Sequence, residues 1–255
     1  QRYNEIELPT GQPINISLPN GRLNRASIGW SRLPVQVDTI RGYPLRKKRW
    51  NYWAVVTPDC LFSITLSNVD YMGLVFAYVL DFKTQKFIEK TVMAPFGKNC
   101  VLPPTVEGNI RFEHKDMLLR MDDSGSEIEI DLSVPEFGGQ KLDATLRIQR
   151  PSGLESLNVM IPWSDTRYHF TSKQNCLPAS GTVKIGAQEY GIVPERDFAC
   201  LDYGRGIWKY SSFWNWSSFS AHVGADTVGV NLGAGWTDGA NTTENSLLIN
   251  GSLQR

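Results

Sequence analysis

Short runs of apolar residues, separated by turn residues, follow one another from Trp50 to Leu253. The runs are rich in β-branched and aromatic residues, and residues 127–132 alternate between Glu or Asp and Ile or Leu. Such alternation is typical of strands with one buried face and one solvated face. The pattern predicts strands at 50–57, 60–67, 73–82, 86–93, 108–114, 117–123, 127–133, 143–149, 156–162, 181–186, 189–193 and 227–236.

The predicted strands recur about every ten residues, which indicates an antiparallel meander. No stretch has the apolar period of an amphipathic helix of ordinary length. Because open sheet edges invite aggregation, a meander of this length is expected to close into a barrel or to fold into a sandwich. We therefore predict an all-β, antiparallel barrel or sandwich.

A polar and aromatic stretch at 163–174 interrupts the alternation, and we place a domain boundary there. Residues 1–170 are predicted to form a first barrel with an irregular N-terminal arm. Residues 171–255 are predicted to form a second β unit packed on the first. The chain ends just after a hairpin signal at Asn250-Gly251, so the second unit is expected to be incomplete at its C-terminus.

The densest aromatic run is residues 201–218, LDYGRGIWKYSSFWNWSS. On a strand, Trp214 and Trp216 would share one face, and two indoles on a face make a wall that can hold a ligand. Two glycines beside them would let the backbone turn sharply or approach a ligand closely. The alternative is a core strand in which Asp202 pairs with Arg205, and the sequence leaves both readings open.

The carboxylates that could transfer protons near this wall are Asp202, Asp238 and Glu244. Burial against an indole favours the protonated form of a carboxyl group, which suits a proton donor at neutral pH. Among the histidines, His222 lies nearest the predicted cavity, whereas His114 and His169 are expected to be structural. We predict catalytic roles for Asp202, Glu244 and His222, and a ligand-binding cavity lined by Trp50, Trp53, Tyr203, Arg205, Trp214, Trp216 and Trp236.

The sequence contains 26 basic and 26 acidic residues, so its formal net charge is zero. This balance argues against nucleic acid as the main partner, and no apolar run approaches the ~18 residues of a membrane span. The four cysteines have no metal-ligand spacing, so we expect reduced thiols, no metal site and no cofactor. The oligomeric state stays open.

The chain begins at Gln1 rather than at a methionine, so we expect a processed or trimmed product. Four Asn-x-Ser/Thr sequons would suit a secreted glycoprotein. One of them, at Asn215, lies between two tryptophans on a predicted strand, which is a poor place for a glycan. We therefore expect a cytoplasmic protein, with secretion as the alternative.

Three separated motifs, KKRWNYW, LDYGRGIWKYSSFWNW and NLGAGWTDGANTTENSLLINGSL, resemble the domain-of-unknown-function family numbered 2804. The hairpin GTVKIGAQEYGI, followed by Asp202 and the Trp-Asn-Trp strand, is more loosely similar to the lipocalin-like group of hydroxyneurosporene synthase and AttH-type proteins. That similarity implies a lipocalin-like fold and hydration, isomerisation or cyclisation of apolar substrates, or their binding. Tyr203 stands where that group has His, which puts any chemistry of that His in doubt here.

Two function classes therefore remain. The first is a lipocalin-like enzyme that acts on a small, largely apolar molecule by proton transfer, with Asp202 or Glu244 as acid or base. The second is a carrier of a hydrophobic ligand without chemistry, which would need few ionisable groups facing the cavity. A weaker third possibility is a carbohydrate-active protein, because tryptophans beside paired carboxylates also describe a sugar cleft.

Overall fold

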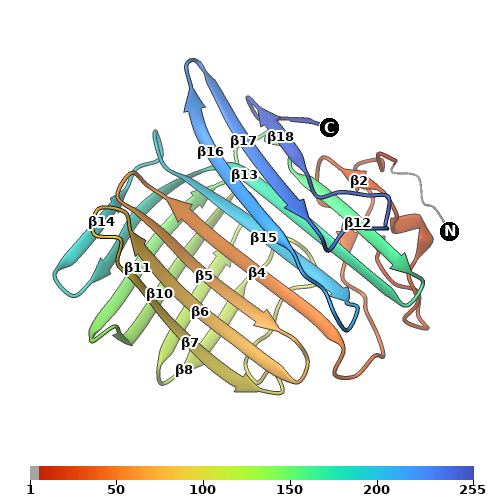
Figure 1. Cartoon of the computed structure of the whole chain (residues 1–255), viewed down its shortest axis with the longest axis horizontal. Helices are drawn as coiled ribbons and strands as arrows, with labels where there is room; N and C mark the ends of the chain where they lie inside the picture. The colour runs from red at the N-terminus through yellow and green to blue at the C-terminus, as the bar shows by residue number, and fades with distance from the viewer. Residues whose placement is uncertain (1–5) are drawn as a thin grey trace.

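The computed structural model describes residues 6–255, and their regular structure is almost entirely β-strand (Figure 1). Within these residues there is no α-helix, only a short 3-10 turn at Arg25–Ser27. Accordingly, no helix in this range could cross a membrane. The predicted all-β, antiparallel architecture is confirmed. Residues 1–5, where the first predicted unit begins, lie outside the described residues.

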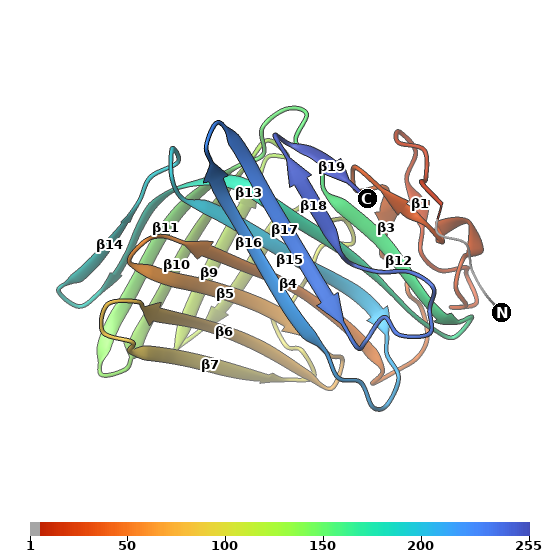
Figure 2. The same cartoon turned by 45° about the horizontal axis from the view of Figure 1, so that its top comes forward.

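The main sheet has 13 strands and curls into a half-barrel (Figure 2). Its hydrogen-bonded path runs through β7 (Phe87–Pro95), β6 (Met72–Asp81), β5 (Cys60–Asn68), β4 (Lys47–Val56), β15 (Phe198–Ile207), β13 (Arg167–Ile185), β11 (Gln140–Gln149), β10 (Glu127–Phe137), β9 (Met117–Asp123) and β8 (Ile110–His114). Off this path, β13 also pairs with β12 (Leu157–Ser164) and β14 (Gln188–Ile192), and β12 pairs with β2 (Trp30–Ser31). Near the N-terminus, β1 (Ile14–Asn15) and β3 (Gln36–Val37) form a small parallel ladder.

Alternation along the strands builds the core inside the half-barrel. In β10, Glu129 and Asp131 are exposed while Ile128, Ile130 and Leu132 are buried, as the sequence predicts. The buried sides of the strands join in one large apolar cluster. Each fully buried aliphatic side chain of this kind stabilises the fold by roughly 1.5–3 kcal/mol.

A second sheet crosses the outer face of the main sheet, over β4, β15 and β13 (Figures 1 and 2). Its four strands are β16 (Asn215–Val223), β17 (Asp226–Ala234), β18 (Ser246–Ile249) and β19 (Ser252–Gln254). A second apolar cluster joins residues of both sheets and includes Trp30, Leu157, Val159, Ile161, Trp208, Trp236, Leu248 and Leu253. The middle strands of the main sheet are therefore buried on both faces.

The predicted division at residue 170 falls inside β13, which runs without a break from Arg167 to Ile185. Strand β15, from the second predicted unit, pairs with β4, from the first, along the whole of β4. The two predicted units thus share one sheet. The polar stretch 163–174 covers the end of β12, a turn at Asp165 and Thr166, and the start of β13. From Tyr168 onward both faces of β13 are buried, the polar face as well as the apolar one.

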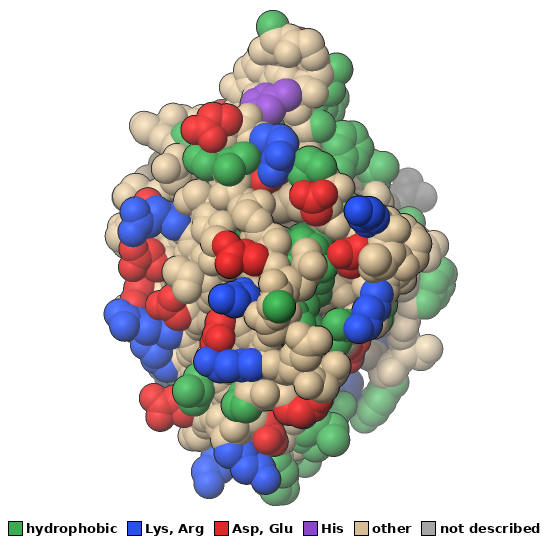
Figure 3. Space-filling model, turned by 90° about the vertical axis from the view of Figure 1, so that its left-hand side faces the viewer, with side chains coloured by type: hydrophobic (Ala, Val, Ile, Leu, Met, Phe, Trp, Pro, Cys, Tyr) green, Lys and Arg blue, Asp and Glu red, His purple; other side chains and the backbone are tan. Residues whose placement is uncertain are grey.

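Charged side chains on the face that carries β14 are of both signs and lie interspersed (Figure 3). Among the described residues on this face there is no wide area of one sign. Basic and acidic side chains therefore offset one another on this face. The face has no basic stripe of the kind that binds a phosphate backbone.

Candidate functional site

A cavity of about 500 Å³ lies between the main sheet and the second sheet. Strands β4, β5, β6, β13 and β15 supply its floor, and residues from Trp208 onward supply its roof. Its lining consists of Lys48, Trp50, Tyr52, Thr65, Ser67, Val69, Leu74, Phe76, Tyr78, Lys173, Asp202, Trp208, Trp214, Trp216, Trp236 and Glu244. The lining therefore combines a wide aromatic surface with two lysines, Lys48 and Lys173, and two acidic residues, Asp202 and Glu244.

Strand β15 presents different chemistry on its two faces. Asp202 lines the cavity, and alternation places Gly204 and Gly206 on the same side. Leu201 and Tyr203 point the other way and belong to the apolar core of the half-barrel. This strand is therefore the partition between the core and the cavity.

The two glycines of β15 leave room for flat rings rather than for a sharp turn. A Cβ atom at Gly204 would collide with the indole of Trp50, and one at Gly206 would collide with the imidazole of His169. The two rings stack on each other with centroids 4.7 Å apart. The missing side chains thus allow Trp50 and His169 to lie across the strand.

The ionisable centre of the cavity is Lys173, which is held between two carboxylates. Its Nζ lies 2.7 Å from Oδ1 of Asp202 and 2.8 Å from Oε2 of Glu244. The indole N–H of Trp50 also donates to Oδ1 of Asp202, at 3.2 Å, and that of Trp236 donates to Oε1 of Glu244. Glu244 fits close to the backbone because residue 233 is glycine; a Cβ there would strike the carboxylate.

The charge of Lys173 is set by competing effects. Burial alone would lower the pKa of Lys173, but the neighbouring Asp202 and Glu244 outweigh it, and the pKa is raised above its ordinary value. Lys173 is therefore an ammonium ion at neutral pH. An ammonium has three N–H donors, and the carboxylates of Asp202 and Glu244 engage at most two of them.

The two carboxylates differ in access to the cavity. The side chain of Asp202 is 17% exposed, whereas that of Glu244 is 1% exposed. Both contacts of Asp202 use Oδ1, and no side chain of residues 6–255 donates to its Oδ2. Asp202 Oδ2 is therefore the carboxylate oxygen that a ligand can reach.

His169 positions two of the cavity's indoles. It is fully buried, and burial, reinforced by the cations Lys173, Arg205 and Lys48, moves the pKa of His169 well below its ordinary value. The neutral ring accepts the indole N–H of Trp208 at Nδ1, at 2.9 Å. Its proton is consequently on Nε2. The imidazole therefore acts as a fixed acceptor rather than as a titrating group.

The other tryptophans complete the wall. Trp208 and Trp236 stack with centroids 5.4 Å apart and ring planes 9° from parallel. Trp216 donates its N–H to Oδ1 of Asn231 at 2.8 Å, and Asn231 donates to the backbone carbonyl of Glu244 at 2.7 Å. This chain of hydrogen bonds ties the aromatic wall to the ionisable centre.

Of the residues predicted for the site, Asp202, Glu244, Trp50, Trp214, Trp216 and Trp236 line one cavity. Trp214 lies just before β16 rather than on it, and it is 60% exposed at the edge of the cavity.

The structure places the remaining four predicted residues elsewhere. Trp53 and Arg205 are each three positions from a cavity residue, Trp50 and Asp202, so strand alternation turns them to the opposite face. Tyr203, next to Asp202, faces the core for the same reason. His222 is exposed on β16, where it packs on Phe198 and contacts the hydroxyl of Thr227 at 3.2 Å.

Arg205 does not pair with Asp202. Its guanidinium donates to the backbone carbonyls of Trp50, Gly204 and Pro103 and to Oδ1 of Asn51. The nearest carboxylate oxygen is Oδ2 of Asp38, at 3.9 Å from Nε. The Asp202–Arg205 pair considered from the sequence is therefore wrong, and Lys173 is the partner of Asp202.

Sequence reasoning missed Lys173, Lys48, Tyr52, Tyr78, Trp208 and the positioning role of His169. One available signal was the alternation in 168–173, where His169, Thr171 and Lys173 fall on one face and Tyr168 and Phe170 on the other. Read as a strand, this stretch carries a line of polar groups on a single face. The stretch was instead interpreted as a domain boundary, and its polar face was therefore left out of the predicted site.

The part of the chain from residue 6 onward contains no group of three His, Cys, Asp or Glu side chains placed to hold a metal ion. All four cysteines are free thiols. Burial raises the pKa of Cys60, Cys100 and Cys200 to about 11 and also raises that of Cys176. These thiols are therefore protonated at neutral pH and poorly suited to act as nucleophiles.

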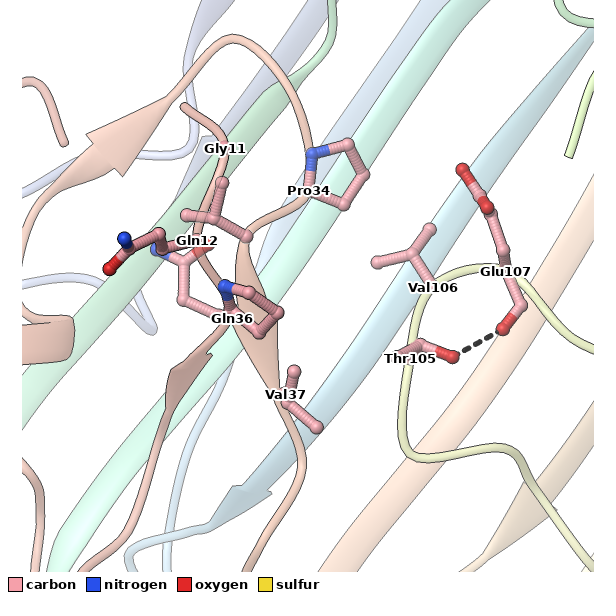
Figure 4. A pocket seen from close by; sticks show the side chains of 10 residues that line it. Gly11, Gln12, Pro34, Gln36, Val37, Thr105, Val106 and Glu107 are labelled. Atoms are coloured by element: carbon pink, nitrogen blue, oxygen red, sulfur yellow. Dashed lines mark hydrogen bonds between the residues drawn. The ribbon is translucent and has the colours of Figure 1, made fainter. Parts of the chain in front are cut away.

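A second hollow, of about 340 Å³, lies between residues 11–13, 34–37 and 105–107 (Figure 4). Val37 and Val106 approach it from two sides, and Thr105 donates to the backbone carbonyl of Glu107 at 2.5 Å. Glu107 is the one ionisable residue in its lining. Proton transfer requires a proton donor or acceptor next to the ligand, and the cavity at Lys173 offers both an ammonium and carboxylates. It is therefore the stronger candidate.

Comparison with curated proteins finds no match to the chain. Among solved structures, kievitone hydratase from Nectria haematococca is similar with a TM-score of 0.49 and 9% sequence identity. The similarity covers 82% of this chain, which spans 63% of the length of that structure. A family model matches residues 6–255, and the chain therefore belongs to the family described as domain of unknown function DUF2804.

Proposed function

We propose that the protein binds a small, largely apolar molecule in the cavity between its two sheets and transfers a proton to or from it. The observation that carries this proposal is the Lys173 ammonium, held between Asp202 and Glu244 beneath a wall of indoles. Aromatic walls bind flat apolar molecules through area and stacking. A buried cation between two carboxylates offers both a proton donor and a proton acceptor to the same ligand.

The roles follow from the contacts of each group. Asp202 is the proposed base, because its Oδ2 is open to the cavity and takes the proton from a carbon next to a carbonyl group. The electron pair then moves to the carbonyl oxygen of the substrate, where the spare N–H of Lys173 stabilises the negative charge. If a C=C bond is conjugated with the carbonyl, Asp202 can return the proton at the far carbon of the conjugated system, which is an isomerisation. If a β-hydroxyl group leaves instead and takes the proton that Asp202 holds, water is released and the step is a dehydration, whose reverse is hydration.

Glu244 is a positioning residue in this scheme. It is almost completely buried, accepts from the indole N–H of Trp236 and lies 2.8 Å from Nζ of Lys173. Removing its charge is expected to loosen Lys173 without removing the base itself.

A carbohydrate-active function is less favoured by the position of Lys173. Glycoside hydrolysis requires two carboxylates that flank the bond to be cleaved. Here the lysine ammonium occupies the space between Asp202 and Glu244 and contacts both. A carrier without chemistry is kept as an outcome of the test below.

The test uses 2-tetralone, an apolar aryl ketone whose protons next to the carbonyl exchange with solvent. In D₂O the wild-type protein is expected to accelerate deuterium uptake, followed by mass spectrometry, and Asp202→Asn is expected to lose about 10²-fold or more of that rate. Asp131→Asn is the matched control, because Asp131 is exposed on β10, where it accepts from the hydroxyl of Thr145 at 3.2 Å, and it does not line this cavity.

Binding is measured separately by quenching of tryptophan fluorescence. Trp216→Ala is expected to weaken binding of 2-tetralone by about tenfold, the loss of a ring contact of 1–1.5 kcal/mol. Phe219→Ala, on the exposed face of the same strand β16, is expected to leave binding unchanged. Binding without accelerated exchange would favour the carrier, and absence of binding would overturn the cavity as the functional site.

A further inference from the structure

Lys48 is the second cation of the cavity, and it lies at the end away from Lys173. Alternation along β4 points Lys48, Trp50 and Tyr52 toward the same side, and all three line the cavity. In register, Lys48 pairs with Gly206, which pairs with His169. The ammonium of Lys48 lies 5.2 Å from the ring centre of Trp208.

The basic neighbours of Lys48 are engaged by other groups. Lys47 lies 3.2 Å from Oδ2 of Asp70, and Arg49 lies 2.7 Å from Oδ2 of Asp38. Arg46 stacks on the ring of Tyr210, 3.9 Å from its centre, and donates to the backbone carbonyl of Trp208. Lys48, by contrast, has no carboxylate within ion-pair distance anywhere in residues 6–255.

The setting of Lys48 is unfavourable for a lone cation. Burial, and to a smaller extent the nearby Arg46, lowers the pKa of Lys48. An anion placed beside this ammonium would replace the water that it has lost and would offset the repulsion from Arg46.

The opposite end of the cavity has the opposite polarity. With both carboxylates ionised, Lys173, Asp202 and Glu244 together carry one negative charge. An anionic group on a ligand is therefore repelled from that end and attracted to Lys48. The cavity thus orients a ligand that has a single negative charge.

We propose that the substrates are aromatic or conjugated carboxylates, bound with the carboxylate at Lys48 and the reacting carbon at Asp202. This inference rests on the proposed function, whose ligand class it narrows. Lys48 and Tyr52, which pairs with Asp202, are four residues apart on β4. At about 3.3 Å per residue, the two positions are roughly 13 Å apart. A carboxylate with two fused rings, together with the length of the lysine side chain, can bridge this distance.

The experiment compares two probes with the same rings, 2-naphthoate and its neutral amide, 2-naphthamide. Wild-type protein is expected to bind 2-naphthoate about tenfold more tightly, measured by tryptophan fluorescence at low salt. Lys48→Met is expected to abolish this preference while keeping the affinity for 2-naphthamide. Lys209→Met is the control, because Lys209 is an exposed cation in the adjoining loop that does not line the cavity.

A charge-reversal variant shows whether a lost preference in Lys48→Met comes from the missing charge or from misfolding. Lys48→Glu is expected to favour 2-naphthylmethylammonium over 2-naphthoate, the reverse of the wild-type order. Equal binding of the two probes by the wild-type protein, or a preference that survives in Lys48→Met, would overturn the inference and leave the proposed function standing. If neither naphthalene probe binds while 2-tetralone does, the inference fails alone; if 2-tetralone fails as well, both fail.

Discussion

Two buried cations lie on neighbouring strands of the main sheet, Arg205 on β15 and Lys173 on β13, and they face opposite sides. Arg205 is completely buried on the half-barrel side of the main sheet. It donates to three backbone carbonyls and to the side-chain amide oxygen of Asn51. Its ring partner is Tyr203, 3.7 Å from the guanidinium. Burial lowers the pKa of Arg205, and no carboxylate approaches closely enough to offset it.

Lys173 is just as deeply buried, but its partners are themselves ionisable and line a cavity. A cation whose donors end on backbone oxygens fixes the positions of strands, and it has nothing to exchange a proton with. A cation held by carboxylates next to an open space can take part in proton transfer. Both cations are buried, so burial does not distinguish them. Their hydrogen-bond and ion-pair partners do: those of Arg205 indicate a structural role, and those of Lys173 indicate a role in proton transfer.

Replacing Arg205 tests the structural side of this comparison and should have the largest effect on stability. Arg205→Met is expected to lower the free energy of unfolding by about 4 kcal/mol, because several buried carbonyl oxygens lose their donor. Urea unfolding followed by tryptophan fluorescence measures the change. Folded Arg205→Met should still bind 2-tetralone; loss of binding at full occupancy of the folded state would contradict a purely structural role.

Replacing Lys173 tests the chemical side. Lys173→Met is expected to lower the free energy of unfolding by about 3 kcal/mol, because it leaves two carboxylates without a counter-ion. The double variant Lys173→Met, Glu244→Gln should recover part of that loss, since one of the stranded charges is gone. Neither variant should exchange deuterium into 2-tetralone. A single-variant loss below about 1 kcal/mol would mean that the two carboxylates are not ionised together.

The pH dependence of stability isolates His169 and is the smallest of the three effects. The pKa of His169 is depressed in the folded protein, so below about pH 6.5 the unfolded chain binds a proton that the folded chain does not. The free energy of unfolding should therefore fall by about 1.4 kcal/mol for each pH unit below ~6.5 from this group. His169→Asn keeps an acceptor for Trp208 but should lack this contribution; equal slopes in the two proteins would contradict the assignment.

Most strands of the half-barrel and their core were predictable, because alternation depends on each strand alone. Strand β15 and the first part of β13 were not among the predicted strands. The same rule separates Trp50 from Trp53 and Asp202 from Arg205, since residues three apart on a strand face opposite ways. Applied to the predicted site, it would have removed Trp53, Tyr203 and Arg205 before the structure was known. The aromatic wall and its carboxylates Asp202 and Glu244 were found because indoles cluster visibly in the sequence.

Two features could not be predicted from the sequence: the pairing of Asp202 with Lys173, and the sharing of one sheet by the two predicted units. Pairing of β4 with β15 depends on which distant strands meet, and no local pattern encodes that. The crossing of the second sheet then buries a face of β13 that polar residues mark as solvated. The position of Lys173 on a polar face could be read from the sequence, but its pairing with Asp202 is recognisable only after both long-range contacts are known.

The pairing of β4 with β15 also has a consequence for synthesis of the chain. Strand β4 ends at Val56 and β15 begins at Phe198, so roughly 140 residues separate them. At about 5–20 residues per second, the ribosome takes on the order of ten seconds or more to deliver the second strand. During that interval the nascent chain presents one edge of β4 with unpaired N–H and C=O groups, a template for association with other chains. The yield of folded protein is therefore expected to depend on chaperones that hold this edge until Phe198 and the residues after it emerge.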